Sequence, residues 1–362
     1  MTPLRLKLGD ILWKKAFRPY LFGKNAEDAH LFTIRTLKLM QEEELLWLVR
    51  LFYRSPYFDQ KVVVAGRPWR NKVGLAAGFD KQIEVLPALD AFGFGSAEVG
   101  TITWQPQYGS PQPRVFRYQG IRAIINRYGF NSVGAEQAAK NLGKIYRRHR
   151  VNMPIGISIG KNKDTPDERA VNDYLGALRY FIRLIRPQDW VKINISSPNT
   201  PGLRELFGRL DEFLGELKDR VRQLAQEFGA SVPRLMLKVP PDNLSDEQIV
   251  DVVKVAVRCG FCGIEATNTT TDQQIKRDYG LTETGGLSGE PLRERSTRVL
   301  AVMKEPARGV IDLIGVGGIS EAWHFEEKIL AGAKALQIYT GLVFRGPNLL
   351  HEILSAEKDL LR

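Results

Sequence analysis

From residue 57 onward, short apolar runs alternate along the chain with longer stretches that have the periodicity of helices. The stretches 211–228 and 246–258, for example, lie between runs rich in β-branched or apolar residues. Strands that alternate with helices form parallel sheets, and eight such strands favour closure into a barrel. We therefore predict an α/β fold, a (β/α)8 TIM barrel. The eight predicted strands cover residues 72–79, 95–101, 154–160, 190–196, 234–239, 263–269, 312–317 and 335–340.

The N-terminal part of the chain has a different, helical pattern. Leu4, Leu8 and Ile11 fall on one helical face, and the neighbouring basic residues lie mostly off it. The segment 45–53 is apolar nearly all round, so a short helix there must be buried in protein or in lipid. The extension is therefore either a membrane-associated segment or a helical appendage packed on the barrel. We expect two parts, a small N-terminal helical extension over residues 1–56 and the barrel over residues 57–362.

The formal net charge is +11, from 52 Lys and Arg residues against 41 Asp and Glu residues. Such a surplus favours anionic partners, whether acidic substrates, anionic membrane surfaces or nucleic acid. Because no basic run has interleaved aromatic residues, we expect no nucleic-acid partner. No stretch of about 20 apolar residues predicts a spanning helix, and the charges near the N-terminus are not typical of a signal peptide. We expect a peripheral protein at the cytoplasmic face of the cell membrane, or a free cytoplasmic one.

Two cysteines, Cys259 and Cys262, have the C-x-x-C spacing of many metal and redox sites. No second pair of Cys or His residues lies nearby to complete a zinc site, so we expect no metal. The simpler interpretation is two small apolar residues that lead into a strand, in a reducing compartment.

Each of the eight predicted strands ends in polar residues or glycines. In a TIM barrel the carboxyl ends of the strands meet at one rim, where enzymes of this fold place their active sites. One such residue is readily explained as a loop cap, but eight polar strand ends favour a catalytic rim. These residues are Asp80, Lys81, Thr101, Lys161, Asn194, Ser197, Lys238, Thr267, Asn268, Thr269, Gly317, Gly318, Tyr339 and Thr340.

Segments that contain glycine lie at the ends of the last two predicted strands, at 315–319 and 339–341. The loops after strands seven and eight of such barrels often bind a phosphate through backbone N–H groups. Because the G-x-G-x-x-G fingerprint is absent from the start of a βαβ unit, a Rossmann domain is not expected. These loops predict a phosphorylated cofactor.

Asparagine side chains gather after other strands, in the run 194–202, at 268–270 and at 126–127. Amides offer hydrogen-bond donors and acceptors together, which suits a small flat heterocycle with alternating C=O and N–H groups. Turn chemistry is the alternative, since Asn, Ser, Pro and Gly favour turns in any protein.

Seven stretches, in order along the chain, resemble the motifs of the dihydroorotate dehydrogenases. The N-terminal helices, including Ala29-His30, are similar to those of the class 2 members, which reduce a membrane quinone. The matching stretches are 76–81, 125–131, 160–163, 194–202, 266–270, 284–289 and 314–319.

The resemblance implies a reaction and its partners. Dihydroorotate would lose a proton from C5 and a hydride from C6, and the hydride would pass to N5 of FMN. Electrons would then pass to a membrane quinone, and orotate would leave for pyrimidine (UMP) biosynthesis. The N-terminal helices would contact the membrane surface, and a monomer is expected.

The match also implies roles for individual residues. Ser197 would be the catalytic base, and Thr200 would relay its proton through a water, because a serine hydroxyl is a weak base. His30 and Arg117 match positions linked to the quinone. The implied substrate contacts are Lys81, Asn126, Arg127, Tyr128, Gly129, Phe130, Asn194, Asn199, Asn268 and Thr269. The implied FMN contacts are Ala77, Gly78, Phe79, Asp80, Lys81, Thr101, Ser158, Asn194, Lys238, Thr267, Gly289, Gly318, Tyr339 and Thr340.

The chain departs from the family pattern at two positions. Ser158 stands where the family more often has Asn, which puts one FMN contact in doubt because serine makes fewer hydrogen bonds. Trp104 stands where the family usually has Pro, at a strand exit away from the expected chemistry.

Two other classes of function stay open from the residues alone. Another FMN-dependent barrel oxidoreductase would share the phosphate loops but not the paired Asn-rich motifs. A non-enzymatic basic protein, bound to a membrane or to nucleic acid, would carry no flavin.

Overall fold

The computed structural model describes residues 2–199 and 205–360. Eight parallel strands close into a barrel in the order β10-β12-β13-β3-β4-β7-β8-β9, which confirms the predicted fold. The barrel closes where β13 pairs with β3, with Leu336 opposite Val73. Each predicted run matches one barrel strand, and only β3 and β4 extend beyond their runs, by one residue each. The strands are β3 (Val73–Asp80), β4 (Ser96–Ile102), β7 (Ile155–Ile159), β8 (Trp190–Asn194), β9 (Arg234–Val239), β10 (Gly263–Ala266), β12 (Asp312–Val316) and β13 (Ala335–Ile338).

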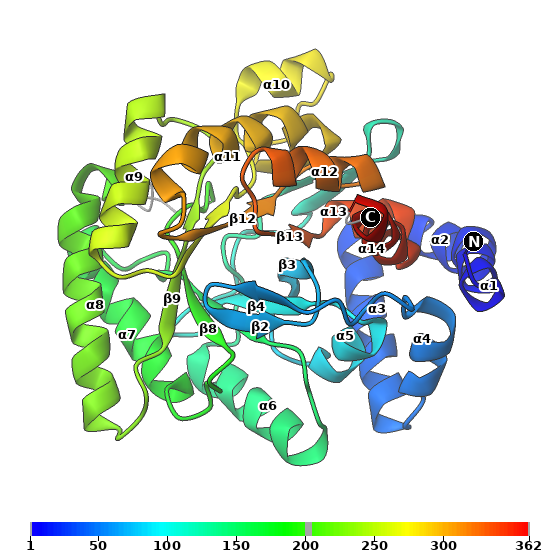
Figure 1. Cartoon of the computed structure of the whole chain (residues 1–362), viewed down its shortest axis with the longest axis horizontal. Coiled ribbons are helices and arrows are strands. Elements are labelled where there is room, and N and C mark those ends of the chain that lie inside the picture. The colour runs from blue at the N-terminus through cyan, green and yellow to red at the C-terminus, as the bar shows by residue number, and fades with distance from the viewer. Residues whose placement is uncertain (1, 200–204, 361–362) are drawn as a thin grey trace.

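Helices surround the barrel and follow its strands in turn (Figure 1). Their apolar faces pack on the strands, and side-chain caps begin some of them. In α9, for example, the Ser245 side chain accepts a hydrogen bond from the Gln248 N–H, and the Gln248 side chain accepts one from the Ser245 backbone N–H. The α-helices after β3 are α5 (Leu86–Phe92), α6 (Ala135–Arg148), α7 (Ala170–Phe181), α8 (Leu210–Glu227), α9 (Asp246–Arg258), α10 (Gln273–Asp278), α11 (Arg293–Ala307), α12 (Ala322–Leu330), α13 (Thr340–Arg345) and α14 (Asn348–Leu360). Short 3-10 helices lie at Gln119–Ile121, Asp167–Arg169, Glu205–Arg209 and Glu290–Leu292.

The N-terminal extension consists of helices, as predicted, and lies beside α13 and α14 (Figure 1). Asn25 caps α3 by accepting a hydrogen bond from the Asp28 N–H at 2.8 Å. The Arg5 side chain donates to the carbonyl oxygens of Leu51 and Arg54, and the Asn348 side chain donates to that of Leu6. These bonds tie the extension to itself and to the barrel. Its elements are α1 (Leu4–Leu12), a π-helical turn (Trp13–Phe17), α2 (Arg18–Phe22), α3 (Ala26–Glu42) and α4 (Leu46–Tyr53).

A short hairpin of β1 (Val62–Val64) and β2 (Arg67–Trp69) closes the amino-terminal end of the barrel. Its Trp69 ring stacks on the ring of Trp190 from β8, with the centroids 5.1 Å apart. Gly156 of β7 leaves room for this pair, because an added Cβ would lie 2.4 Å from the Trp190 ring. Both indoles are almost completely buried, so this end of the barrel is packed shut.

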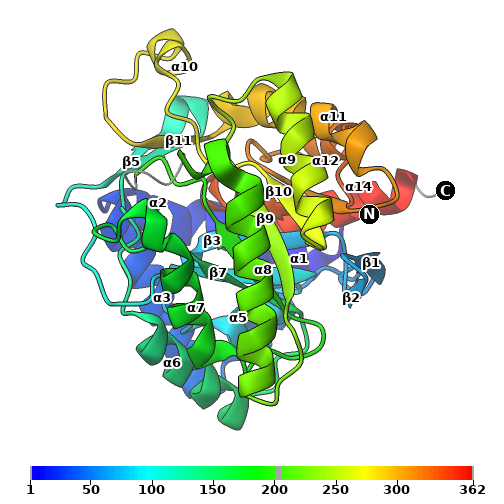
Figure 2. The same cartoon turned by 90° about the vertical axis from the view of Figure 1, so that its left-hand side faces the viewer.

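The other end carries a three-stranded antiparallel sheet that the sequence pattern did not predict. It contains β5 (Val115–Tyr118), β6 (Ala123–Asn126) and β11 (Gly286–Gly289), in the order β11-β6-β5. Figure 2 shows β5 and β11 at one side of the molecule and the β1–β2 hairpin at the opposite side. The sheet joins two insertions that lie far apart in the sequence, so no local pattern predicts the pairing of β6 with β11.

Trp104, where the family pattern has Pro, packs in the space beside Gly176 of helix α7. A Cβ added at Gly176 would lie 2.3 Å from the Trp104 ring. A glycine within a helix normally lowers stability. Gly176 is explained by the Trp104 ring, which occupies the space that a Cβ would need.

We predict that Gly176→Ala lowers the free energy of unfolding by ~1–3 kcal/mol, because the methyl group would displace the Trp104 ring. The matched control is Gly215→Ala in helix α8, where an added Cβ meets nothing within 4 Å. That control is expected to raise stability by up to ~1 kcal/mol through helix propensity. Urea denaturation of both variants measures the difference, and equal stabilities would contradict the packing role of Trp104.

Candidate active site

The carboxyl ends of the barrel strands surround a cavity that the β5-β6-β11 sheet borders from above. Its lining comes from segments spread between residues 76 and 341, which agrees with the predicted convergence of strand ends at one rim. Predicted site residues that line it are Ala77, Gly78, Lys81, Thr101, Asn126, Tyr128, Gly129, Phe130, Asn194, Ser197, Asn199, Lys238, Thr267, Asn268, Thr269, Gly289, Gly318, Tyr339 and Thr340.

A continuous chain of hydrogen bonds crosses the floor of this cavity from β7 to the loop after β10. The Ser158 and Thr101 hydroxyls lie 2.8 Å apart, and Thr101 Oγ1 accepts a bond of 2.9 Å from Asn194 Nδ2. Asn194 Oδ1 accepts from the Ser196 hydroxyl, which in turn accepts from Asn268 Nδ2, both at 3.0 Å. The amides are therefore held in fixed orientations, which is what recognition of a heterocycle requires.

Ser197 is almost completely buried at the edge of the cavity, on the loop after β8. Its Oγ accepts a hydrogen bond of 3.3 Å from the Asn199 N–H. The Asn199 side chain donates at 3.3 Å to the carbonyl oxygen of Asn126 in β6, so the loop is joined to the sheet above it. Thr200, the predicted relay, lies outside the described residues.

Lys81 brings a positive charge to the opposite edge of the cavity. Its Nζ lies 3.3 Å from the centroid of the Tyr128 ring and donates to Asn131 Oδ1. Burial and the nearby Arg114 lower the pKa of Lys81 to about 7, against the opposing charge of Glu27. A carboxylate that entered the cavity would favour the charged form.

The loops after β12 and β13 form a compact turn of glycines and hydroxyls. Gly318 has φ +75°, and a Cβ added there would lie 2.4 Å from the backbone of Arg293, so only glycine fits. The Ser288 and Thr340 hydroxyls lie 2.9 Å apart at the same side of the cavity. Backbone N–H groups and hydroxyls of this kind are suited to a phosphate.

Comparisons with known proteins agree with this geometry. The family model described as "Dihydroorotate dehydrogenase" matches residues 60–361. The chain belongs to the dihydroorotate dehydrogenase family. Curated relatives named "Dihydroorotate dehydrogenase (quinone)" include one from Vibrio parahaemolyticus, 41% identical, and one from Methylobacillus flagellatus, 42% identical. Each alignment covers 93% of this chain and 97% of the relative, which places the chain in the quinone-dependent branch of the family.

Solved structures of the same family have the same fold. The DHODH of Eimeria tenella in complex with ferulenol has a TM-score of 0.76 and 33% identity, over 89% of this chain and 91% of that one. The ligand-free form of the same enzyme also has a TM-score of 0.76, with 35% identity over 88% and 93% of the two chains.

Four of the implied substrate and FMN contacts do not line the cavity. Arg127 points away from it and donates to the carbonyl oxygen of Pro113. Asp80 accepts bonds from the backbone N–H groups that precede α5, and burial raises its pKa to about 6. Ser158 lies one step below the floor, bonded to Thr101, and Phe79 lies behind the cavity wall.

The two residues linked to the quinone lie between the N-terminal helices and the barrel. His30 of α3 contacts Phe79 edge-on at 5.7 Å, and Phe79 contacts Tyr339 at 6.2 Å, so an aromatic series leads from α3 to the cavity. Burial, with a contribution from Lys81, lowers the pKa of His30 to about 4. Arg117 donates to the carbonyl oxygens of Leu21 and Lys24 and thereby fastens α2 to β5.

The sequence analysis overlooked several lining residues, among them Ser288 and Gln337. Ser288 lies inside a quoted family stretch, next to Gly289, so the motif itself contained the signal. Gln337 lies in the middle of β13, two positions before Tyr339, and the period-2 alternation of strands would have aimed it at the same side.

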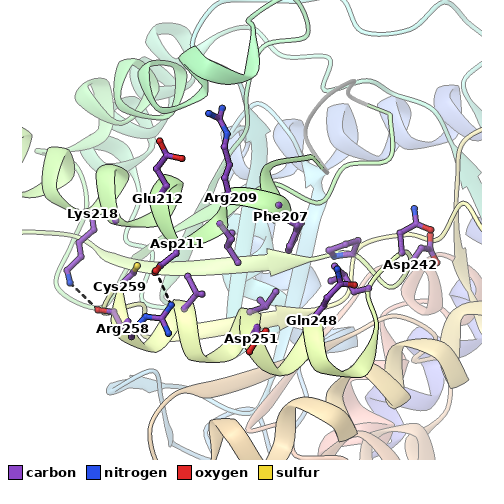
Figure 3. A pocket seen from close by; sticks show the side chains of 18 of the residues that line it. Phe207, Arg209, Asp211, Glu212, Lys218, Asp242, Gln248, Asp251, Arg258 and Cys259 are labelled. Carbon is purple, nitrogen blue, oxygen red and sulfur yellow. Dashed lines mark hydrogen bonds and ion pairs between the residues drawn. The ribbon is translucent and has the colours of Figure 1, made fainter.

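An open groove on the outside of the barrel contains none of the predicted site residues. It lies between α8 and α9 and carries charges of both signs, including the ion pair of Asp211 with Arg258 at 3.1 Å (Figure 3). The groove has none of the buried, hydrogen-bonded amides that line the cavity at the barrel rim.

Proposed function

We propose that the chain oxidises dihydroorotate to orotate with bound FMN and passes the electrons to a membrane quinone. The observation that carries this proposal is the convergence of Ser197, Lys81 and the bonded amides in one cavity next to the glycine turn. FMN, when bound, accepts the hydride that leaves the substrate.

The residues present fit this cofactor. The turn at Gly318 has no room for a side chain and offers backbone N–H groups to a phosphate. Gln337 Oε1 is buried at the cavity and has no hydrogen-bond partner in the described part of the chain, so a ligand with N–H donors would satisfy it. Lys238 supplies a cation at the same floor.

Ser197 acts as the base in this proposal, and Lys81 with the amides holds the substrate. The substrate carboxylate would pair with the Lys81 ammonium, while the Asn side chains fix the ring so that its C5 proton faces Ser197 Oγ. Burial of Ser197 excludes bulk water from the proton transfer. Thr200 relays the proton outward.

We predict that Ser197→Ala retains FMN but slows flavin reduction by dihydroorotate at least ~100-fold, because the proton acceptor is lost. Anaerobic stopped-flow absorbance measures the rate, and the flavin-to-protein ratio measures retention. Reoxidation of chemically reduced flavin by a quinone serves as the internal control and stays at the wild-type rate. Near-normal reduction by dihydroorotate would remove Ser197 from this role.

We predict that orotate binding to the FMN-loaded protein weakens as pH rises above about 7. The pKa of Lys81 is lowered to about 7, so the ammonium loses its proton above that pH and a carboxylate ligand must restore it. The dissociation constant should rise up to about tenfold per pH unit.

The comparison uses Lys81→Met, which should bind orotate weakly and with little dependence on pH. Lys163→Met removes an exposed lysine outside the cavity and should keep the wild-type profile. Titrations followed by flavin absorbance give the constants. A Lys81→Met profile with the wild-type slope would show that another group titrates.

Residues 1–56 form the membrane and quinone-access segment in this proposal, at the cytoplasmic face of the membrane. The predicted apolar face of α1 stays exposed, with Leu4 at 73% and Ile11 at 55% exposure, and Trp47 of α4 at 54%. Exposed lysines lie beside it. No helix within residues 2–199 and 205–360 is long and apolar enough to cross a membrane. This combination is typical of helices that lie in a membrane interface.

We predict that the double variant Leu4→Ser/Ile11→Ser binds phosphatidylglycerol vesicles at least about tenfold more weakly than the wild type, because two apolar side chains no longer enter the lipid. The control is Leu330→Ser, which removes an equally exposed leucine from α12, away from the extension. Vesicle sedimentation measures both. Equal loss in the control would contradict a specific membrane face.

A further inference from the structure

A layer of buried charges lies inside the barrel directly below the cavity. Glu98 of β4, Lys192 of β8 and Glu265 of β10 are each completely buried. Lys192 Nζ lies 2.8 Å from Glu265 Oε2 and also contacts Glu98. Trp190 Nε1 donates to Glu98 Oε1 at 3.1 Å, which joins the charged layer to the packed indoles beneath it. The interior of such barrels is usually filled by branched apolar side chains, so these charges call for an explanation.

Two side chains connect this layer to the cavity, and Glu265 contacts both of them. Lys238 Nζ lies 3.6 Å from Glu265 Oε2, and Gln337 Nε2 donates to Glu265 Oε1 at 3.3 Å. Lys238 and Gln337 line the cavity, whereas Glu265 does not. The Glu265 carboxylate therefore contacts two polar groups of the cavity lining from the side of the barrel interior.

The same carboxylate takes part in the charge balance of the layer. Lys192, Lys238, Glu98 and Glu265, when ionised, sum to zero, and removal of one partner leaves an uncompensated charge in the barrel interior. Burial lowers the pKa of Lys192, and the Glu265 carboxylate opposes that effect. The negative charge of Glu265 therefore contributes to the electric field at the cavity floor.

We propose that Glu265 is a positioning residue for the redox reaction. It aims Lys238 and Gln337 at the flavin and offsets the Lys238 charge, and so sets the reduction potential of the bound flavin. This inference rests on the proposed function, since it requires FMN in the cavity. It assigns the charged layer a role in tuning the cofactor rather than in holding the barrel together.

Glu98 provides a matched control within the same layer. Glu98→Gln and Glu265→Gln remove the same charge from the same buried lysine, but only Glu265 contacts Lys238 and Gln337. Loss of a negative charge next to the cavity favours the electron-rich form of the flavin. We expect Glu265→Gln to raise the reduction potential of the flavin by ~30 mV, which corresponds to about a tenfold change in the two-electron equilibrium constant. Glu98→Gln should change the potential by less than half of that.

The test measures the potential by spectroelectrochemical titration of the FMN-loaded variants, and FMN affinity by fluorescence. A double-mutant cycle with Lys238→Met separates positioning from general electrostatics: in that background Glu265→Gln should no longer shift the potential. If the single variants do not fold, Lys192→Gln/Glu265→Gln and Lys192→Gln/Glu98→Gln keep the net charge at zero and carry the same comparison.

Equal shifts for the two glutamates, or a shift that persists without Lys238, would overturn the positioning role. Reduced stability with an unchanged potential would overturn it as well, since that is the result expected of a purely structural ion pair. A wild-type protein that binds no FMN would instead refute the proposed function, so the two failures are distinguishable.

Discussion

The pairing of β13 with β3 is the constraint on which the site depends. Only a closed barrel turns all eight parallel strands so that their carboxyl ends face one opening, and the closing contact joins the first and last barrel strands. Without it, Lys81 after β3 and Thr340 after β13 would lie at opposite edges of an open sheet. The site is therefore a property of closure rather than of any one motif.

Closure also creates an interior that changes character along the barrel axis. Stacked indoles of Trp69 and Trp190 seal one end, charges occupy the middle, and bonded amides form the floor of the cavity. Buried ion pairs contribute little net stability compared with apolar packing, because desolvation offsets their attraction. An arrangement that gives up apolar packing in the centre of the barrel makes sense where the charges serve the cavity next to them.

The sequence predicted the barrel strands and their polar ends because both signals are local. Apolar runs and the residues that follow them are recognised within a few positions, and each predicted run matches its strand to within a few residues. The β5-β6-β11 sheet was not predicted because β6 pairs with β11, which lies far along the chain. Motif resemblance was less exact for side chains, since neighbours in a strand face opposite sides: Asp80 follows the family pattern yet bonds to the backbone N–H groups that precede α5. Glu265 was not predicted because it lies inside its strand rather than at the strand end, and its only local signal was a single charge.

The N-terminal helices pack against the structure that surrounds the cavity. Arg117 fastens α2 to the sheet above the cavity, and His30 reaches Phe79, which backs the wall at Tyr339. The face of these helices that meets the barrel is thus used to approach the cavity, while the opposite face leaves large apolar side chains exposed. Contiguous exposed apolar surface is unfavourable in water, so that face is explained when lipid covers it. An apolar electron acceptor dissolved in that lipid would then meet the protein where aromatic contacts lead from α3 to the cavity.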